Sequence, residues 1–91
     1  MTERLRIALA QLNPTVGDIV GNARLVREAR AKARAAGADL VLLSELFLSG
    51  YPPEDLVLKP ALVAGARKTA SELAAETKDG GPGVLLGLPW A

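Results

Sequence analysis

One glutamate, Glu45, stands at the point where a buried strand is expected to end. It follows directly on the apolar residues 39–43 (DLVLL) and Ser44. In an open α/β sheet, ligands bind beyond the carboxyl ends of the strands. A carboxylate at that edge is partly removed from water, which raises its pKa and suits it to act as a general base. The same position also fits a glutamate that caps a backbone amide or pairs with a surface arginine, so both interpretations stay open.

Tyr51 is the only tyrosine in the chain, and two prolines follow it. The prolines restrict the backbone of the loop around this tyrosine. Its ring could form one wall of a ligand pocket, or it could fold onto the core with its hydroxyl in water. Glu54 and Asp55, a few residues later, are interpreted as favourable charge at the start of a short helical turn rather than as a second acidic pair.

The composition excludes several kinds of chemistry within these 91 residues. The chain has no cysteine and no histidine, so it contains no thiol nucleophile, disulfide, thiolate metal site or imidazole base. We therefore predict no metal site. Eleven Lys and Arg against ten Asp and Glu leave a net charge of +1, which is not typical of a generic nucleic-acid binder.

Two local patterns are assigned no ligand. Residues 22–36 carry five basic side chains and one acidic one, and without interleaved aromatic residues we interpret them as a solvated helix face. Residues 80–83 (GGPG) follow a predicted helix and precede a predicted strand, which is the reverse of the order in a phosphate-binding loop.

Neither a membrane span nor a signal peptide is predicted. The longest purely apolar runs, such as residues 40–43, are far shorter than the roughly 18 residues that indicate a span. The apolar stretch at residues 7–12 is short and interrupted by Gln11, unlike the core of a signal peptide. We expect a cytoplasmic protein with no membrane partner.

The hydrophobic pattern predicts the elements that must position Glu45. Short apolar runs at residues 6–12, 39–43 and 84–88 predict buried strands, whereas apolar stripes at helical spacing predict helices over 22–36 and 60–78. Asn22 is the expected N-cap of the first helix and Gly37 its stop, while Pro60 suits the first position of the second helix. The alternation of strand and helix predicts an α/β fold with a parallel sheet.

Two helices cover one face of a three-stranded sheet, yet the predicted strands are apolar on both faces. We therefore expect residues 1–91 to form the first part of a larger domain. A small βαβαβ domain that dimerises to cover its sheet is the alternative.

Residues 38–60 (ADLVLLSELFLSGYPPEDLVLKP) and 5–22 (LRIALAQLNPTVGDIVGN) resemble the carbon–nitrogen hydrolase, or nitrilase, superfamily. Within it, GYPPEDL at residues 50–56 and GVLLGLPW at 83–90 are similar to the N-terminal glutaminase domains of bacterial glutamine-dependent NAD⁺ synthetases. The resemblance implies the β-α-β-α-β start of an α-β-β-α sandwich, cut after its third strand.

The resemblance also implies a Glu–Lys–Cys triad that hydrolyses the amide of glutamine. The family glutamate falls on Glu45, as general base, and a tyrosine of the glutamine pocket falls on Tyr51. The family lysine and cysteine lie further along than residue 91, so Lys59, Lys68 and Lys78 do not match, and the 91 residues alone are expected to be inactive.

In such enzymes a separate synthetase domain uses the ammonia with ATP and Mg²⁺ to convert nicotinic acid adenine dinucleotide to NAD⁺. We expect no cofactor within residues 1–91, and a homo-oligomer for the full-length enzyme. The alternatives are a fragment of a stand-alone nitrilase-type amidase and a small non-catalytic α/β association module.

Overall fold

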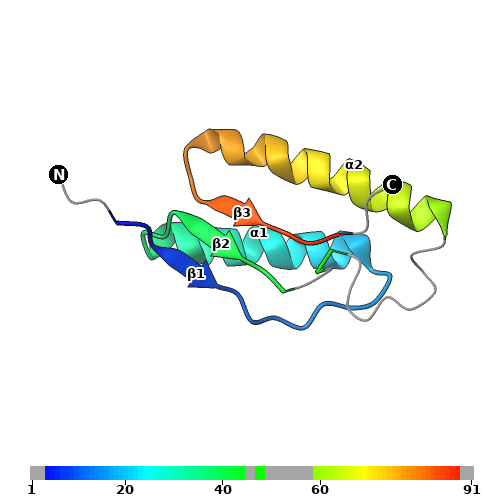
Figure 1. The fold of residues 1–91 in the computed structure, drawn as a ribbon, viewed down its shortest axis with the longest axis horizontal. Coiled ribbons are helices and arrows are strands. Elements are labelled where there is room, and N and C mark those ends of the chain that lie inside the picture. Colours follow the sequence, from blue (N-terminus) through cyan, green and yellow to red (C-terminus); the bar gives the residue numbers. More distant parts are fainter. Residues whose placement is uncertain (1–3, 45–46, 49–58, 89–91) are drawn as a thin grey trace.

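The computed structural model describes residues 4–44, 47–48 and 59–88. Its three strands are β1 (Ile7–Leu9), β2 (Leu40–Leu42) and β3 (Gly83–Leu85). Its helices are α1 (Ile19–Ala35) and α2 (Pro60–Glu76), and a 3-10 turn, η2 (Thr77–Asp79), follows α2. The strands are parallel and adjoin in the order β1-β2-β3 (Figure 1). The predicted α/β fold is confirmed, with strands shorter than the apolar runs that predicted them.

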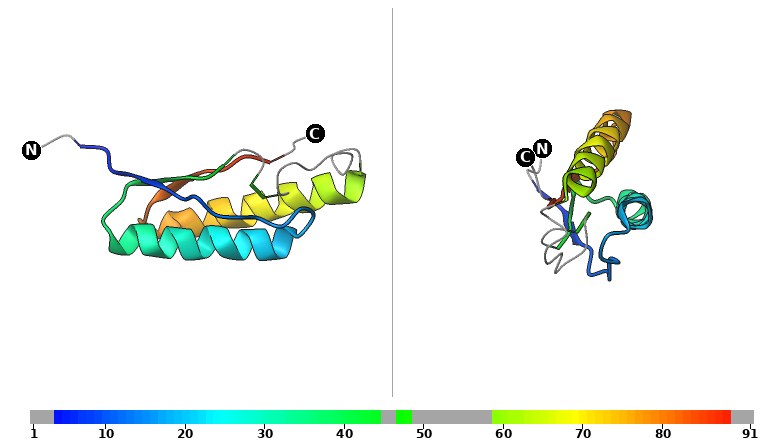
Figure 2. Two further views of the ribbon diagram at one scale, coloured as in Figure 1. Left: turned by 90° about the horizontal axis from the view of Figure 1, so that it is seen from below. Right: turned by 90° about the vertical axis from the view of Figure 1, so that its right-hand side faces the viewer.

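Strand register sorts the side chains onto two faces. Val41 pairs with Ala8 on one side and with Val84 on the other, and Leu42 pairs with Leu9 and Leu85 in the same way. Because side chains alternate along a strand, the first row faces one side of the sheet and the second row faces the other. Both helices lie on one side of the sheet (Figure 2). Val41 is 1% exposed and belongs to the core that the helices cover.

The core between sheet and helices is built largely from small side chains. The buried apolar residues of the two helices are Ala23, Val26, Ala33, Val63, Ala66 and Leu73. Alanines on facing helical stripes allow close approach, and a Cβ added at Gly65 of α2 would lie 3.4 Å from the Ile19 side chain of α1. The apolar spacing that predicted two amphipathic helices therefore marked their packed faces correctly.

The opposite face of the sheet is apolar and uncovered in the described part of the chain. Ile7, Leu9 and Leu85 are 49%, 67% and 57% exposed. A solvent-facing sheet surface normally carries polar residues in alternation with the buried ones. These residues of β1 and β3, together with Leu42 of β2 in the same row, instead form what we call the open face, as the two-sided apolar pattern predicted.

The prediction that Asn22 caps α1 is wrong. The helix begins one turn earlier, at Ile19, and Asp18 is its N-cap, with its carboxylate accepting a 2.9 Å hydrogen bond from the Gly21 amide. Asp18 takes this role because a carboxylate in the loop can satisfy a free amide of the first turn. Asn22 lies inside the helix and is 1% exposed.

The other predicted helix boundaries are confirmed within a few residues. Gly37 follows the end of α1 with a φ of +78°, the left-handed conformation that glycine tolerates best. Pro60 is the first residue of α2. The second helix ends at Glu76, and η2 continues the predicted helical segment as far as Asp79.

Three arginines of α1 pair with acidic groups at the end of α2. Arg27 and Arg34 stay exposed, as the predicted solvated face requires, whereas the Arg30 side chain is mostly buried. Arg27 donates to the Glu76 carboxylate at 2.9 Å, and Arg34 donates to Asp79 at 3.1 Å. Arg30 donates to Asp79 at 2.9 Å and to the Pro82 carbonyl at 2.8 Å. These contacts join α1 to the segment that leads from α2 into β3. Pairings between residues 45 to 52 positions apart cannot be seen in local charge spacing.

The Asp79 contacts predict a stability that depends on pH. Hydrogen bonds from Arg30 and from the Gly81 amide hold the pKa of Asp79 well below its ordinary value of 3.8. A carboxyl group with a lowered pKa in the folded state stabilises that state above its ordinary pKa, and this contribution is lost as the pH falls. Asp79→Asn should therefore lower the amide exchange protection of residues 77–83 at pH 6. The difference from the unsubstituted protein should shrink below about pH 4. If Asp79→Asn lowers the exchange protection equally at pH 6 and below about pH 4, the role of the Asp79 charge is contradicted.

Candidate active site

The carboxyl ends of all three strands lie at one edge of the sheet, because the strands are parallel. In the sequence, Glu45 comes three positions after the last residue of β2. Glu45 and Tyr51 both lie outside the described residues, as do Glu54 and Asp55. Their predicted roles stay predictions. The site is therefore built from the described residues that adjoin Glu45, namely Ser44 on one side and Phe47 and Leu48 on the other.

The chain is anchored on both sides of residues 45–46. The Leu43 amide donates to the Leu85 carbonyl at 3.1 Å, and the Leu48 amide donates to the Gly87 carbonyl at 3.3 Å. Phe47 and Leu48 are fully buried, at 0% exposed. Leu43 and Leu48, which follow β2, are thus bonded to the end of β3 and to the residues just after it. Buried apolar side chains and paired backbone groups hold both flanks of Glu45 in place.

Asn22 of α1 bonds to the turn at residues 47–48. Its Oδ1 accepts a hydrogen bond from the Thr15 amide at 2.8 Å. Its Nδ2 donates to the Thr15 carbonyl at 2.8 Å and to the Leu48 carbonyl at 3.0 Å. The orientation of the amide follows from these partners, since only the oxygen can face an N–H group and only the nitrogen can face two carbonyls. We call this group of three hydrogen bonds the Asn22 clamp.

The Asn22 clamp was not predicted, although the sequence carries a signal for it. Asn22 lies four residues before Val26 and seven before Ala29, which places it on the apolar stripe of α1. A buried carboxamide is costly unless it is hydrogen-bonded. An asparagine on the packed stripe of a helix therefore indicates polar partners brought in from other segments.

A groove of about 530 Å³ opens at the carboxyl ends of β1 and β2. Its lining is mainly apolar, with polar groups from Gln11, Asn13 and Ser44. Mainly apolar walls with a few polar groups are typical of small-molecule sites. Ser44 immediately precedes Glu45, so this carboxyl-edge groove is the described cavity nearest to Glu45 in sequence. We take it as part of the candidate active site.

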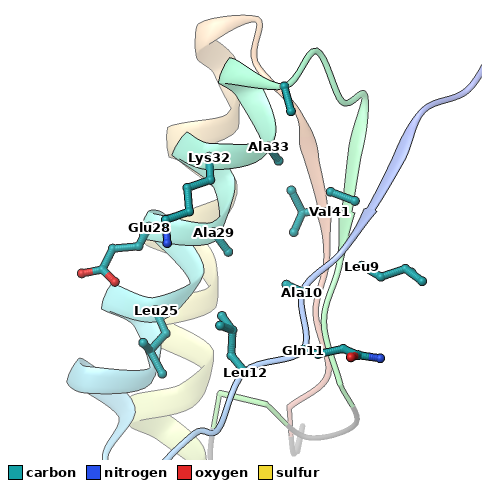
Figure 3. Close-up of a pocket in the computed structure, with 12 residues that line it drawn as sticks. Leu9, Ala10, Gln11, Leu12, Leu25, Glu28, Ala29, Lys32, Ala33 and Val41 are labelled. Carbon is teal, nitrogen blue, oxygen red and sulfur yellow. The ribbon is translucent and has the colours of Figure 1, made fainter.

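A second groove, of about 350 Å³, lies between α1 and β1 (Figure 3). Leu12 of the loop after β1 points toward Leu25 of α1, whereas Leu9 and Gln11 point away from the helix. The ionisable groups in its lining are Glu28 and Lys32, both exposed on α1. Its lining does not include Ser44, Phe47 or Leu48, the described residues that adjoin Glu45, so we do not assign it to the site.

Among residues 4–44, 47–48 and 59–88, no group of three or more His, Cys, Asp or Glu side chains is arranged to hold a metal ion. Neither helix within those ranges has the length and hydropathy needed to cross a membrane.

The chain is similar to known proteins over nearly its whole length. The carbon-nitrogen hydrolase family matches residues 6–90. A glutamine-dependent NAD(+) synthetase of Rhodobacter capsulatus is 52% identical over 90 residues, which cover 99% of this chain and 16% of that protein. The chain thus spans about one sixth of the length of this curated relative.

Two solved structures are also similar. The crystal structure of a glutamine-dependent NAD(+) synthetase from Cytophaga hutchinsonii has a TM-score of 0.85 at 33% identity, over 96% of this chain and 15% of that one. An amidase from Nesterenkonia sp. AN1, in a glutamate-to-glutamine variant with acrylamide added at its active site cysteine, has a TM-score of 0.68 at 32% identity. That match covers 80% of this chain and 30% of the amidase. With a family match that extends over residues 6–90, the chain belongs to the carbon–nitrogen hydrolases.

Proposed function

We propose that this chain is the N-terminal part of the glutaminase domain of a glutamine-dependent NAD⁺ synthetase. The observation that carries the proposal is the 52% identity to the Rhodobacter capsulatus synthetase across 99% of the chain. The higher TM-score with the Cytophaga synthetase than with the Nesterenkonia amidase supports the same choice.

In the proposed reaction, Glu45 is the general base. By resemblance to the family, it takes the proton from a cysteine thiol supplied by the rest of the domain. The thiolate attacks the carboxamide carbon of glutamine, and a lysine of the same domain stabilises the oxyanion. Glu45 then gives the proton to the departing nitrogen, so ammonia leaves and a glutamyl thioester remains. Water then attacks the thioester carbon while Glu45 accepts one of its protons, and Glu45 returns that proton to the departing sulfur, which releases glutamate and restores the thiol.

The described residues have a supporting part in this proposal. Glutamine would lie at the carboxyl ends of β1 and β2, where Gln11, Asn13 and Ser44 line the carboxyl-edge groove. Their amide and hydroxyl groups can bond the polar ends of such a substrate. Tyr51 is proposed as one wall of the glutamine pocket. The anchored flanks of Glu45 would keep its carboxylate at a fixed position, which efficient proton transfer needs.

Ammonia produced here would be used elsewhere in the same protein. We propose that a synthetase domain beyond these 91 residues uses ATP and Mg²⁺ to activate nicotinic acid adenine dinucleotide, and that ammonia then yields NAD⁺. A homo-oligomeric, cytoplasmic enzyme is part of this proposal.

A stand-alone amidase is the second candidate, because the Nesterenkonia amidase shares the fold at 32% identity. Such an enzyme would hydrolyse amides without any synthesis of NAD⁺. The products of the reaction separate the two candidates.

The test compares the full product of the gene with residues 1–91 alone. With glutamine, ATP and nicotinic acid adenine dinucleotide, the full product should form both glutamate and NAD⁺. Residues 1–91 should release no ammonia from glutamine, since they contain no cysteine to form the thioester. Ammonia release by residues 1–91 would overturn the cysteine mechanism. Amide hydrolysis by the full product without NAD⁺ would instead favour the amidase.

A further inference from the structure

We propose that Asn22 is a positioning residue for glutamine hydrolysis, and that it acts through the turn that follows Glu45. The inference rests on the proposed role of Glu45 as general base. It concerns a side chain on α1 that lies 23 positions earlier in the sequence.

The Asn22 clamp consists of three hydrogen bonds from one carboxamide to backbone groups of two residues, Thr15 and Leu48. One acceptor meets the Thr15 amide, and two donated bonds meet the carbonyls of Thr15 and Leu48, all within 2.8 to 3.0 Å. The side chain is 1% exposed, so water cannot simply replace these partners. An aspartate of the same shape could not donate to two carbonyls, and a leucine could bond none of them.

The clamp joins two loops at the same edge of the sheet. Thr15 belongs to the loop between β1 and α1, which begins beside the carboxyl-edge groove. Leu48 lies three residues after Glu45 in the turn that follows β2. Through one carboxamide, α1 thus holds both the loop near the groove and the turn at residues 47–48, which begins two positions after Glu45 in sequence.

The Leu48 carbonyl is the point where Asn22 can influence the position of Glu45. On either side of residues 45–46, the Leu43 amide is bonded to Leu85, the last residue of β3, and the Leu48 amide is bonded to Gly87, just after β3. Removing Asn22 would leave the buried Leu48 carbonyl without this partner. The Leu48 amide bond and the buried Phe47 and Leu48 side chains would remain, but the link from residues 47–48 to α1 through this carbonyl would be lost. Misplacing a reacting group by about 1 Å can slow a reaction about 100-fold.

The experiment uses the full product of the gene and the variant Asn22→Leu. The expected result is a loss of about 100-fold in kcat for the glutamine-driven reaction, with a smaller change in KM and with unchanged synthesis from added ammonia. Leu73→Ala is the matched control, because Leu73 is a buried residue of α2 that does not line the carboxyl-edge groove. It should lower the melting temperature and leave both reactions unchanged.

If Asn22→Leu yields no soluble protein, Asn22→Asp takes its place. This variant keeps the size of the side chain and the acceptor for Thr15, and it removes the two donated bonds. The same loss of kcat is expected. Glutamine-driven activity within a few-fold of the unsubstituted enzyme in either soluble variant would overturn the proposal.

A double substitution separates positioning from general loss of structure. Glu45→Asp keeps a carboxylate but shortens its reach. If Asn22 acts by placing the Glu45 carboxylate, Asn22→Leu should cost much less in the Glu45→Asp background than alone. Fully multiplicative losses would overturn the positioning role while leaving Glu45 as base. If Glu45→Gln hydrolyses glutamine normally, the proposed role of Glu45 itself fails.

Discussion

Glu45→Gln should abolish glutamine-driven NAD⁺ synthesis and leave synthesis from added ammonia intact. A glutamine side chain at position 45 has nearly the same shape as the native glutamate side chain but cannot accept the thiol proton. Loss of a general base costs about 10² to 10⁴ in rate. The synthetase reaction does not need the thioester when ammonia is supplied directly. The measurement is the initial rate of NAD⁺ formation with each nitrogen source.

Glu72→Gln is the matched control for this substitution. Glu72 lies exposed on α2, away from the carboxyl-edge groove, and its replacement removes the same charge. Both nitrogen sources should support normal rates in the control. Equal losses with both sources in Glu45→Gln would mean that the glutamate serves folding instead of proton transfer.

Leu9→Lys should prevent the full product of the gene from folding into soluble protein. Leu9 is 67% exposed in the described part of the chain, so a lysine would be harmless there if the open face met water. The proposed parent domain, an α-β-β-α sandwich, requires a second sheet to cover that face. An unpaired charge buried between two sheets costs about 3 to 5 kcal/mol, a large part of the stability of a domain.

Val20→Lys provides the comparison for Leu9→Lys. Val20 is 72% exposed on the first turn of α1 and is therefore at least as accessible as Leu9. Soluble yield and melting temperature should stay near those of the unsubstituted protein. Normal yield and melting temperature for Leu9→Lys would show that the open face is not packed against another layer.

The arrangement of strands and helices could be predicted because its signals are local. Alternating apolar runs and helical stripes follow from periodicity, and Pro60 and Gly37 mark boundaries through their own backbone preferences. The open face was also predictable, since strand residues such as Leu9 and Leu42 are apolar on the side away from the helices.

The contacts that hold the candidate site together could not be predicted in the same way. Asn22 was assigned as a cap from its type and position, but its partners include Leu48, which is 26 residues away. Arg30 and Asp79 are separated by 49 residues and meet only after α1 and α2 pack together. Such pairs depend on tertiary packing, which no window along the sequence contains. The assignments of Glu45 and Tyr51 came from resemblance and from position after β2, and they remain predictions.

Transfer of nitrogen from glutamine to NAD⁺ tests the central claim most directly. The full product of the gene would be incubated with glutamine labelled with ¹⁵N at its amide, ATP, Mg²⁺ and nicotinic acid adenine dinucleotide. Mass spectrometry of the product should find NAD⁺ carrying one ¹⁵N atom. At least one glutamate should form for each labelled NAD⁺. Hydrolysis of the labelled amide without labelled NAD⁺ would contradict the assignment to a glutamine-dependent NAD⁺ synthetase.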